Sequence, residues 1–101
     1  YNKQKYLGVI KNIFNRKGKK ELMENGFPEI WNREFLSVHN CCIASSIIIH
    51  KDVIEKVGSF SNQLWAPDYE YWLRALQHTD LVYVDQPLLY WDCGHGDGQN
   101  Y

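Results

Sequence analysis

The acidic residue best suited to chemistry is Asp68, which follows Pro67 and opens the clearest helical run of the sequence. A carboxylate acts as a general base when it lies within hydrogen-bonding reach of a hydroxyl whose proton it can accept. An aspartate at the start of a helix can instead accept hydrogen bonds from the first backbone N–H groups and cap the helix. Position alone favours the cap. Both roles place the Asp68 carboxylate at a helix N-terminus.

A second set of chemically active side chains consists of histidines and cysteines: His39, Cys41, Cys42, Cys93 and His95. Both residue types bind zinc, so a small metal-binding site is one hypothesis. The three cysteines are odd in number and two are adjacent, which suits neither a disulfide framework nor a CxxC zinc site. The pattern favours reduced, buried, unreactive thiols.

The composition indicates a single globular domain. The chain has 101 residues, of which 45% are apolar and fifteen are aromatic. Disordered chains are poor in aromatics and strongly charged. The longest apolar run, Ile43–Ile49, is interrupted by two serines and is much shorter than the roughly 20 residues that span a bilayer. Because the first residue is Tyr1, we expect a fragment of a longer protein.

The net charge of -1 is unevenly distributed. Residues 1–37 carry eight Lys/Arg and four acids, whereas residues 38–101 carry three and eight. A basic cluster occurs in the first part: Lys11, Arg16, Lys17, Lys19 and Lys20. It could face the phosphates of nucleic acid, lipid or a sugar nucleotide, but a solvated face is favoured. No nucleic-acid partner is predicted, since interleaved aromatics and module signatures are missing.

The segment 1–37 is expected to be helical and irregular. Three of its apolar positions have helical spacing: Ile10, Ile13 and Phe14. A break is predicted near Gly18, followed by a short helical turn that ends at Gly26. A second short amphipathic helix is predicted around four further positions: Ile30, Trp31, Phe35 and Leu36.

The middle of the chain predicts a strand followed by a helix. Residues 38–49 are rich in β-branched and small side chains, which favours a buried strand interrupted around residues 40–42. A short helix over residues 52–57 should end at Gly58, because glycine accepts the left-handed conformation that closes many helices. A loop is expected over residues 59–67.

The strongest periodic signal lies in Asp68–His78 and predicts a central amphipathic helix over residues 68–79. Its apolar side chains fall at i, i+3, i+4 and i+7: Tyr69, Trp72, Leu73 and Leu76. Short strands are predicted over residues 81–84 and 88–91. Helices mixed with short strands predict an α+β or partial α/β fold, with too little chain for a complete doubly wound sheet.

Several motifs follow one another in order between Asn40 and His95. The first is N-x-x-x-x-S-S-x-I-x-x-x-x-x-I-x-x-V-G-S-F over Asn40–Phe60, and the second is D-Y-E-Y-W-L-R-A over Asp68–Ala75. A short strand, the element Pro87–Tyr90 and His95 come next. In this order and spacing the chain resembles family 2 glycosyltransferases.

The resemblance implies a GT-A fold, in which residues 38–101 form the acceptor-side part and residues 1–37 a basic lead segment. It implies that Asp68 is the second acid of a Glu–Asp pair and the general base for in-line, inverting attack by the acceptor hydroxyl. This sequence departs from the family at Pro67, where most members have glutamate.

The resemblance also implies substrate contacts from Tyr69, Trp72 and Arg74 on the same helix. Trp72 would stack against a sugar, and core packing is its alternative role. His95 matches a histidine that reaches a divalent metal or the donor diphosphate in related enzymes. A solvated loop histidine is the alternative for His95.

These motifs predict a fragment of an inverting glycosyltransferase that moves a sugar from a nucleotide-sugar donor to a glycan or other hydroxyl acceptor. No D-x-D motif occurs, so Mn²⁺ or Mg²⁺ is expected only in the intact enzyme, and the isolated chain is expected to be inactive and free of cofactor. The alternative is a non-catalytic binding or assembly module. A homo-oligomer is expected from the uncovered surfaces of a half-domain. The resemblance implies a cytoplasmic location, or a peripheral one at the inner membrane face.

Overall fold

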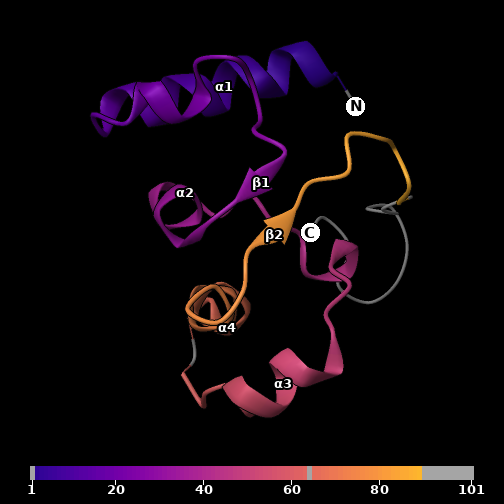
Figure 1. Cartoon of the computed structure of the whole chain (residues 1–101). Helices are drawn as coiled ribbons and strands as arrows, with labels where there is room; N and C mark the ends of the chain where they lie inside the picture. The colour runs from indigo at the N-terminus through magenta and orange to yellow at the C-terminus, as the bar shows by residue number, and fades with distance from the viewer. Residues whose placement is uncertain (1, 64, 90–101) are drawn as a thin grey trace, which may run out of the picture.

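The structure, a computed structural model, describes residues 2–63 and 65–89. Eight elements occur in this part of the chain: α1 (Lys3–Arg16), the 3₁₀-helix η1 (Lys20–Met23), β1 (Ile30–Trp31), α2 (Arg33–Val38), the 3₁₀-helix η2 (Ala44–Ser46), α3 (Lys51–Val57), α4 (Pro67–Ala75) and β2 (Leu81–Val82). Figure 1 shows α1 along one side, the sheet in the middle, and α3 and α4 on the opposite side. The predicted α+β class is confirmed at this level.

Helix α1 contains the three apolar positions for which the sequence predicts helical spacing. The Asn2 side chain accepts a hydrogen bond from a first-turn N–H group and caps the helix. Ile10 and Phe14, one turn apart, are fully buried. Gly18 has φ of 74°, a conformation that suits glycine, and it turns the chain into η1. The predicted break near Gly18 is therefore confirmed.

The helix predicted around residues 30–36 is only partly correct. Ile30 and Trp31 form strand β1, and α2 begins after them. The Asn32 side chain caps α2 by accepting a hydrogen bond from the Phe35 N–H at 2.9 Å. Asparagine at this position favours a new helix start, so the strand and the helix are separate elements.

Strands β1 and β2 form a two-stranded antiparallel sheet. Ile30 pairs with Val82, and Trp31 pairs with Leu81. The strand predicted over residues 81–84 is thus confirmed in its first half. Of the strand predicted over residues 88–91, residues 88 and 89 are irregular and the others lie outside the described residues.

The buried strand predicted over residues 38–49 is wrong. Val38 ends α2, and η2 occupies the centre of the segment. The backbone is extended at His39, Ile43 and Ile47, as β-branched and small residues favour. No strand of the described chain pairs with these residues, and a strand needs a neighbour to form its hydrogen-bond ladder.

Helix α3 confirms the helix predicted over residues 52–57, with one extra residue at its start. Gly58 follows it with φ of 85° and ψ of -149°, and its N–H donates to the Ile54 carbonyl. The positive φ explains why a glycine stands here. At the other end, the His50 Nδ1 atom accepts a hydrogen bond from the Asp52 N–H at 3.1 Å.

Replacing His50 with alanine should lower the free energy of unfolding by about 1 kcal/mol, because the first turn of α3 loses its cap. His50→Asn should retain most of the stability, since asparagine is a good cap. The matched control is His78→Ala, which removes an exposed histidine and should change stability by less than about 0.5 kcal/mol. Urea titration followed by circular dichroism measures all three. Equal stability of His50→Ala and the parent chain would contradict the capping role.

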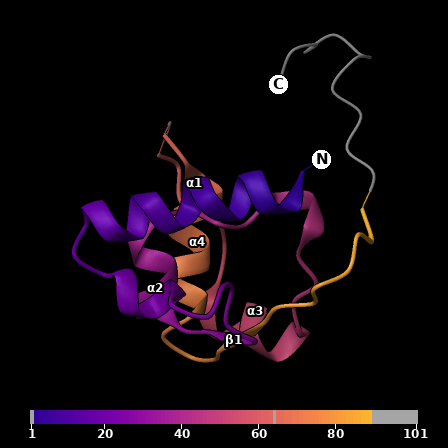
Figure 2. The same cartoon turned by 90° about the horizontal axis from the view of Figure 1, so that it is seen from above.

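The apolar core lies between α1, α2, β1 and α4. Its buried members are Ile10, Phe14, Met23, Trp31, Phe35, Leu36, Val38, Tyr71, Trp72 and Ala75. Phe35 joins two parts of it, because its ring lies 5.0 Å from that of Phe14 and 4.8 Å from that of Trp31, centroid to centroid. Helices α2 and α4 contact each other, as the view from above shows (Figure 2). This packing fixes the position of α4.

Candidate functional site

The inward face of α4 is shifted by one residue from the predicted one. Tyr71, Trp72 and Ala75 are buried, and Asp68 precedes them at the same spacing, i, i+3, i+4 and i+7. Of the predicted set, only Trp72 is fully buried; the other members are half-buried. Asp68 therefore opens the stripe of α4 that faces the core.

Helix α4 also ends earlier than the predicted residue 79. It stops at Ala75, and the N–H groups of Gln77 and His78 bond to carbonyls three residues back instead of four. Such tight final turns are common where a helix ends. The shorter helix still contains all four residues of the inward stripe.

Asp68 stands in the first turn of α4 but is not its N-cap. The N-cap is Ala66, which has left-handed φ and ψ of 46° and 53° and offers no side-chain cap. Pro67 takes the first helical position, where its missing N–H costs nothing. Asp68 Oδ1 accepts a hydrogen bond from the Tyr69 N–H at 2.8 Å, and the helix dipole favours its negative charge.

The surroundings of Asp68 leave most of its capacity to accept hydrogen bonds unused. Within residues 2–63 and 65–89, no lysine, arginine or histidine forms an ion pair with it. Its charge acts on Cys42 and helps to raise the pKa of that thiol. The half-buried Asp68 carboxylate thus lies near the neutral Cys42 thiol. The carboxylate accepts one hydrogen bond, from the Tyr69 N–H.

The adjacent thiols beside α4 are neutral at physiological pH. Burial, followed by the influence of Cys42, raises the pKa of Cys41 to about 12. Burial, followed by the Asp68 charge, raises the pKa of Cys42 to about 11. Because the thiolate is the reactive form and the metal ligand, these values favour unreactive cysteines.

The zinc hypothesis finds no support in the described part of the chain. Burial and the nearby Lys17 lower the pKa of His39. No group of three or more His, Cys, Asp or Glu side chains within the described residues could hold a metal ion. Cys93 and His95, two members of the hypothetical site, lie outside the described residues.

Alkylation of Cys41 and Cys42 by iodoacetamide at pH 8 should be on the order of a hundredfold slower in the folded chain than in urea. The reason is that folding raises both thiol pKa values from 9.0 to about 12 and about 11. Reactivity should rise only as the pH approaches the folded values. Mass spectrometry with residue-level assignment measures each rate. Equal rates with and without urea would contradict the buried, neutral thiols.

Tyr69 connects α4 to α2 through its hydroxyl group. The hydroxyl donates to the Leu36 carbonyl at 2.6 Å. Burial, and then the two thiols at positions 41 and 42, raise the pKa of Tyr69. The predicted substrate contact is thus a residue whose polar atom already holds two helices together.

Arg74 and Tyr71 hold three consecutive carbonyls at the end of α3. The Arg74 guanidinium donates to the carbonyls of Val57 at 3.2 Å and Ser59 at 2.9 Å. The Tyr71 hydroxyl donates to the Gly58 carbonyl between them, at 2.9 Å. Arg74 also pairs with Glu70 and lies 5.1 Å from the centroid of the Tyr71 ring. We call this set of contacts the carbonyl clamp.

The carbonyl clamp connects the two sequence motifs in space. It joins the V-G-S part of the first motif to the Y-W-L-R part of the second, and so fixes α4 against α3. Tyr71 was missed as a functional residue by the sequence analysis. No local sequence pattern predicts that a side chain will bond to a carbonyl thirteen residues away.

Trp72 is a core residue in the described structure. Only 8% of the surface of Trp72 is exposed to solvent. Its ring contacts two others edge to face, with its centroid 6.0 Å from that of Phe60 and 5.7 Å from that of Tyr71. Such pairs add to the stability that burial alone provides. The indole Nε1 is buried and has no hydrogen-bond partner in the described part of the chain.

No protein-family model matches this chain. No curated protein and no solved structure matches it significantly either.

The structure brings together only some of the predicted site residues. Asp68, Tyr69, Trp72 and Arg74 share α4, but the last three make the internal contacts described above. The position of His95 relative to them lies outside the described residues.

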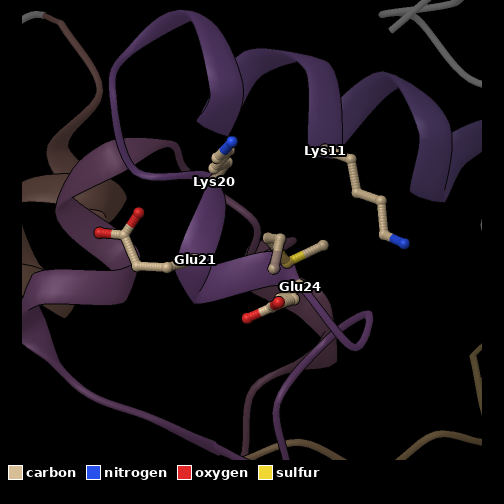
Figure 3. Close-up of a pocket in the computed structure, with 5 residues that line it drawn as sticks. Lys11, Lys20, Glu21 and Glu24 are labelled. Atoms are coloured by element: carbon tan, nitrogen blue, oxygen red, sulfur yellow. The ribbon is translucent and has the colours of Figure 1, made fainter.

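A hollow of about 440 Å³ lies between α1 and η1, away from α4 (Figure 3). Its lining mixes both signs of charge around one methionine: Lys11, Lys20, Glu21, Glu24 and Met23. In Figure 3 the carboxylates of Glu21 and Glu24 do not converge on a common point with the two ammonium groups. We assign no ligand to it.

No helix in residues 2–63 and 65–89 is both long enough and apolar enough to cross a bilayer.

Proposed function

We propose that this chain is the acceptor-side part of an inverting glycosyltransferase of family 2, with a GT-A fold and Asp68 as its general base. The observation that carries the proposal is the place of Asp68. It opens the inward stripe of α4, half-buried, with no cationic partner in the described residues. A carboxylate placed only for capping has no need to face inward, whereas a base must reach a bound hydroxyl.

In the proposed reaction, an oxygen of Asp68 accepts the proton of the acceptor hydroxyl while the oxygen of that hydroxyl attacks the anomeric carbon of the donor sugar. The bond from this carbon to the nucleoside diphosphate breaks, and the diphosphate leaves with the bonding electrons. Attack opposite to the leaving group inverts the anomeric configuration. One carboxylate is enough for this step, since the base removes a proton only once per transfer.

The surrounding residues have positioning roles in this proposal. The carbonyl clamp orients α4, and the Tyr69 hydroxyl fixes its distance from α2. Pro67 stiffens the first turn by fixing φ. Ala66 holds a left-handed conformation that costs about 1 kcal/mol or more in a non-glycine residue, and such strain is common next to functional groups.

A divalent metal does not fit the residues that the structure describes. No cluster of three ligating side chains occurs among residues 2–63 and 65–89, and the sequence has no D-x-D motif. We therefore route no step through a metal in this chain. If Mn²⁺ or Mg²⁺ takes part, its ligands come from elsewhere in the intact enzyme.

A second candidate function, a binding or assembly module without catalysis, is favoured by a different observation. Three of the four residues proposed to touch substrate are engaged internally: Tyr69, Trp72 and Arg74. In this alternative Asp68 serves only to satisfy a first-turn N–H group. The two functions differ in whether sugar transfer depends on Asp68.

Uncovered apolar side chains support a partner for this chain in either case. Trp65 is 86% exposed, and Ile48 is fully exposed in a segment whose backbone is partly extended. Extended, unpaired backbone next to exposed apolar side chains is a surface to which further strands add readily. We propose that the rest of a GT-A sheet covers this surface, and that the isolated chain associates with itself in its place.

The isolated chain should bind no sugar nucleotide, whereas the intact protein should release nucleoside diphosphate when given donor and acceptor. The reason is that the sequence has no D-x-D motif and that the sheet in residues 2–63 and 65–89 has only two strands. Calorimetry with UDP- and GDP-sugars and Mn²⁺ tests the first part, and a diphosphate-release assay tests the second. Saturable micromolar binding by the chain would contradict the missing donor half. Binding of a glycan by an intact protein without transfer would favour the module.

A further inference from the structure

Positive and negative charges lie in different regions of this chain, although its net charge is only -1. Residues 1–20 contain seven Lys/Arg and no Asp or Glu. The remaining residues contain four Lys/Arg and twelve Asp or Glu. The net charge of -1 gives no overall attraction to an anionic partner, so any such attraction must come from one oriented face.

The fold keeps the two charges apart. Figure 1 shows α1 along one side of the molecule and α3 and α4, which carry Asp52, Glu55, Asp68 and Glu70, on the opposite side. Helix α1 therefore forms a cationic side, and the acids of α3 and α4 lie on the other side of the molecule.

One face of α1 points away from the core. Ile10 and Phe14 define the buried face. The opposite face carries a stripe at i, i+4, i+7 and i+11, and all of its members are exposed: Lys5, Val9, Asn12 and Arg16. We call it the α1 outer face. Val9, 52% exposed, places an apolar side chain between two cations.

Gly8, next to Val9 in the sequence, leaves open space at the surface of α1. A methyl group added at Gly8 would meet no atom within 4 Å. A glycine inside a helix lowers stability by about 0.5 to 1 kcal/mol relative to alanine, and no close contact within the described chain requires one here. The absence of a side chain lets the helix backbone approach an external surface closely.

The acidic side chains near α1 neutralise only part of the positive charge of residues 1–20. Lys3 pairs with Asp85 at 2.7 Å and Lys19 with Glu34 at 3.7 Å, both at exposed positions. Glu21 lies on η1 and Glu24 directly follows it, and both line the hollow in Figure 3. Five cations of the segment have no ion-pair partner among the described residues: Lys5, Lys11, Arg16, Lys17 and Lys20. Lys17 instead donates a hydrogen bond to the Val38 carbonyl.

We propose that the α1 outer face docks this chain on an anionic lipid bilayer. Basic residues attract the negative surface of a membrane, and a helix lying in the interface inserts apolar side chains between the cations. Val9 is an exposed apolar side chain that can insert in this way. A surface that binds nucleic acid would instead combine cations with exposed aromatic rings. Of the two aromatic residues of α1, Phe14 is buried and Tyr6 stacks on Phe27 at 5.9 Å between ring centroids. This docking is independent of the proposed transferase activity.

Co-sedimentation of the full 101-residue chain with vesicles tests the docking. Vesicles of phosphatidylcholine mixed with phosphatidylglycerol should bind the chain, and pure phosphatidylcholine should not. Raising the salt from about 0.1 M to about 0.5 M should release it, because screening shortens the reach of surface charges. The double variant Lys5→Gln/Arg16→Gln should bind on the order of thirtyfold more weakly, since each cation near the surface contributes about fivefold. Val9→Ser should also weaken binding.

The matched control is Lys51→Gln/Lys56→Gln, which removes two exposed cations from α3 and should leave vesicle binding within about twofold. All four substituted lysines and arginines are exposed, and circular dichroism checks that both double variants keep their helices. Three results would overturn the proposal: no binding to anionic vesicles, equal losses in the two double variants, or tighter binding to duplex DNA than to anionic vesicles.

Discussion

Replacing Asp68 with asparagine should lower turnover by on the order of a hundredfold or more in an enzyme that carries this chain together with a donor-binding half. Asparagine has the same shape and can still accept the Tyr69 N–H hydrogen bond, but it cannot take the proton of the acceptor hydroxyl. Donor affinity should stay near normal, because the base acts on the acceptor. Steady-state kinetics with separate donor and acceptor titrations measures both effects.

A control separates chemistry from folding in this experiment. Asp80→Asn removes an exposed carboxylate near the other end of the same region and should leave turnover unchanged. The free energy of unfolding of Asp68→Asn should fall by no more than about 1 kcal/mol, the scale of a charge lost near a helix N-terminus. Turnover equal to that of the parent enzyme would show that Asp68 only satisfies a backbone N–H group.

Replacing Trp72 with alanine should lower the free energy of unfolding by about 3 to 5 kcal/mol. The substitution leaves a cavity in the core and removes two edge-to-face contacts, with Phe60 and Tyr71. Because small domains are stable by about 5 to 15 kcal/mol, such a loss unfolds much of the chain at moderate temperature. Denaturant titration followed by near-ultraviolet circular dichroism measures it.

The control for this experiment is a tryptophan of the same chain that lacks a core environment. Trp65 is 86% exposed, so Trp65→Ala should change stability by less than about 0.5 kcal/mol. If Trp72→Ala were as stable as Trp65→Ala, Trp72 would not support the core, and its interpretation as a sugar-stacking residue would be favoured.

Local signals were sufficient to predict several elements of the fold. Helix α1, the break at Gly18 and the end of α3 at Gly58 depend on spacing, caps and glycine conformation within a few residues. Such information is contained in a short stretch of sequence. The break at Gly18 and the end of α3 at Gly58 were accordingly predicted close to their observed positions, and helical spacing was predicted within α1.

Strand β1 and the absence of a strand in residues 38–49 depend on information that a short stretch of sequence does not contain. β1 exists because Ile30 and Trp31 meet residues some fifty positions later. Residues 38–49 have the composition of a strand, yet the described chain provides no neighbour for them. Strand propensity mostly reflects packing against partners, so composition alone identified an extended backbone and not a sheet.

The inward face of α4 was misjudged because two helical stripes compete. Leu73 and Leu76 are more apolar than Asp68 and Ala75, so hydropathy favours the stripe that turned out to be half-buried. The observed face is set by contacts distant in sequence, chiefly the carbonyl clamp of Tyr71 and Arg74. Placement of Asp68 in the first turn was predictable from Pro67, whereas its inward direction was not.

The most direct test of the central claim is the coding sequence that lies upstream of the codon for Tyr1 in the parent gene. An acceptor-side part needs a donor-binding half in the same enzyme. If the proposed glycosyltransferase function is correct, we expect a continuous reading frame that encodes a nucleotide-binding α/β half with a D-x-D motif. A reading frame that encodes a different class of domain, or none, would contradict the account.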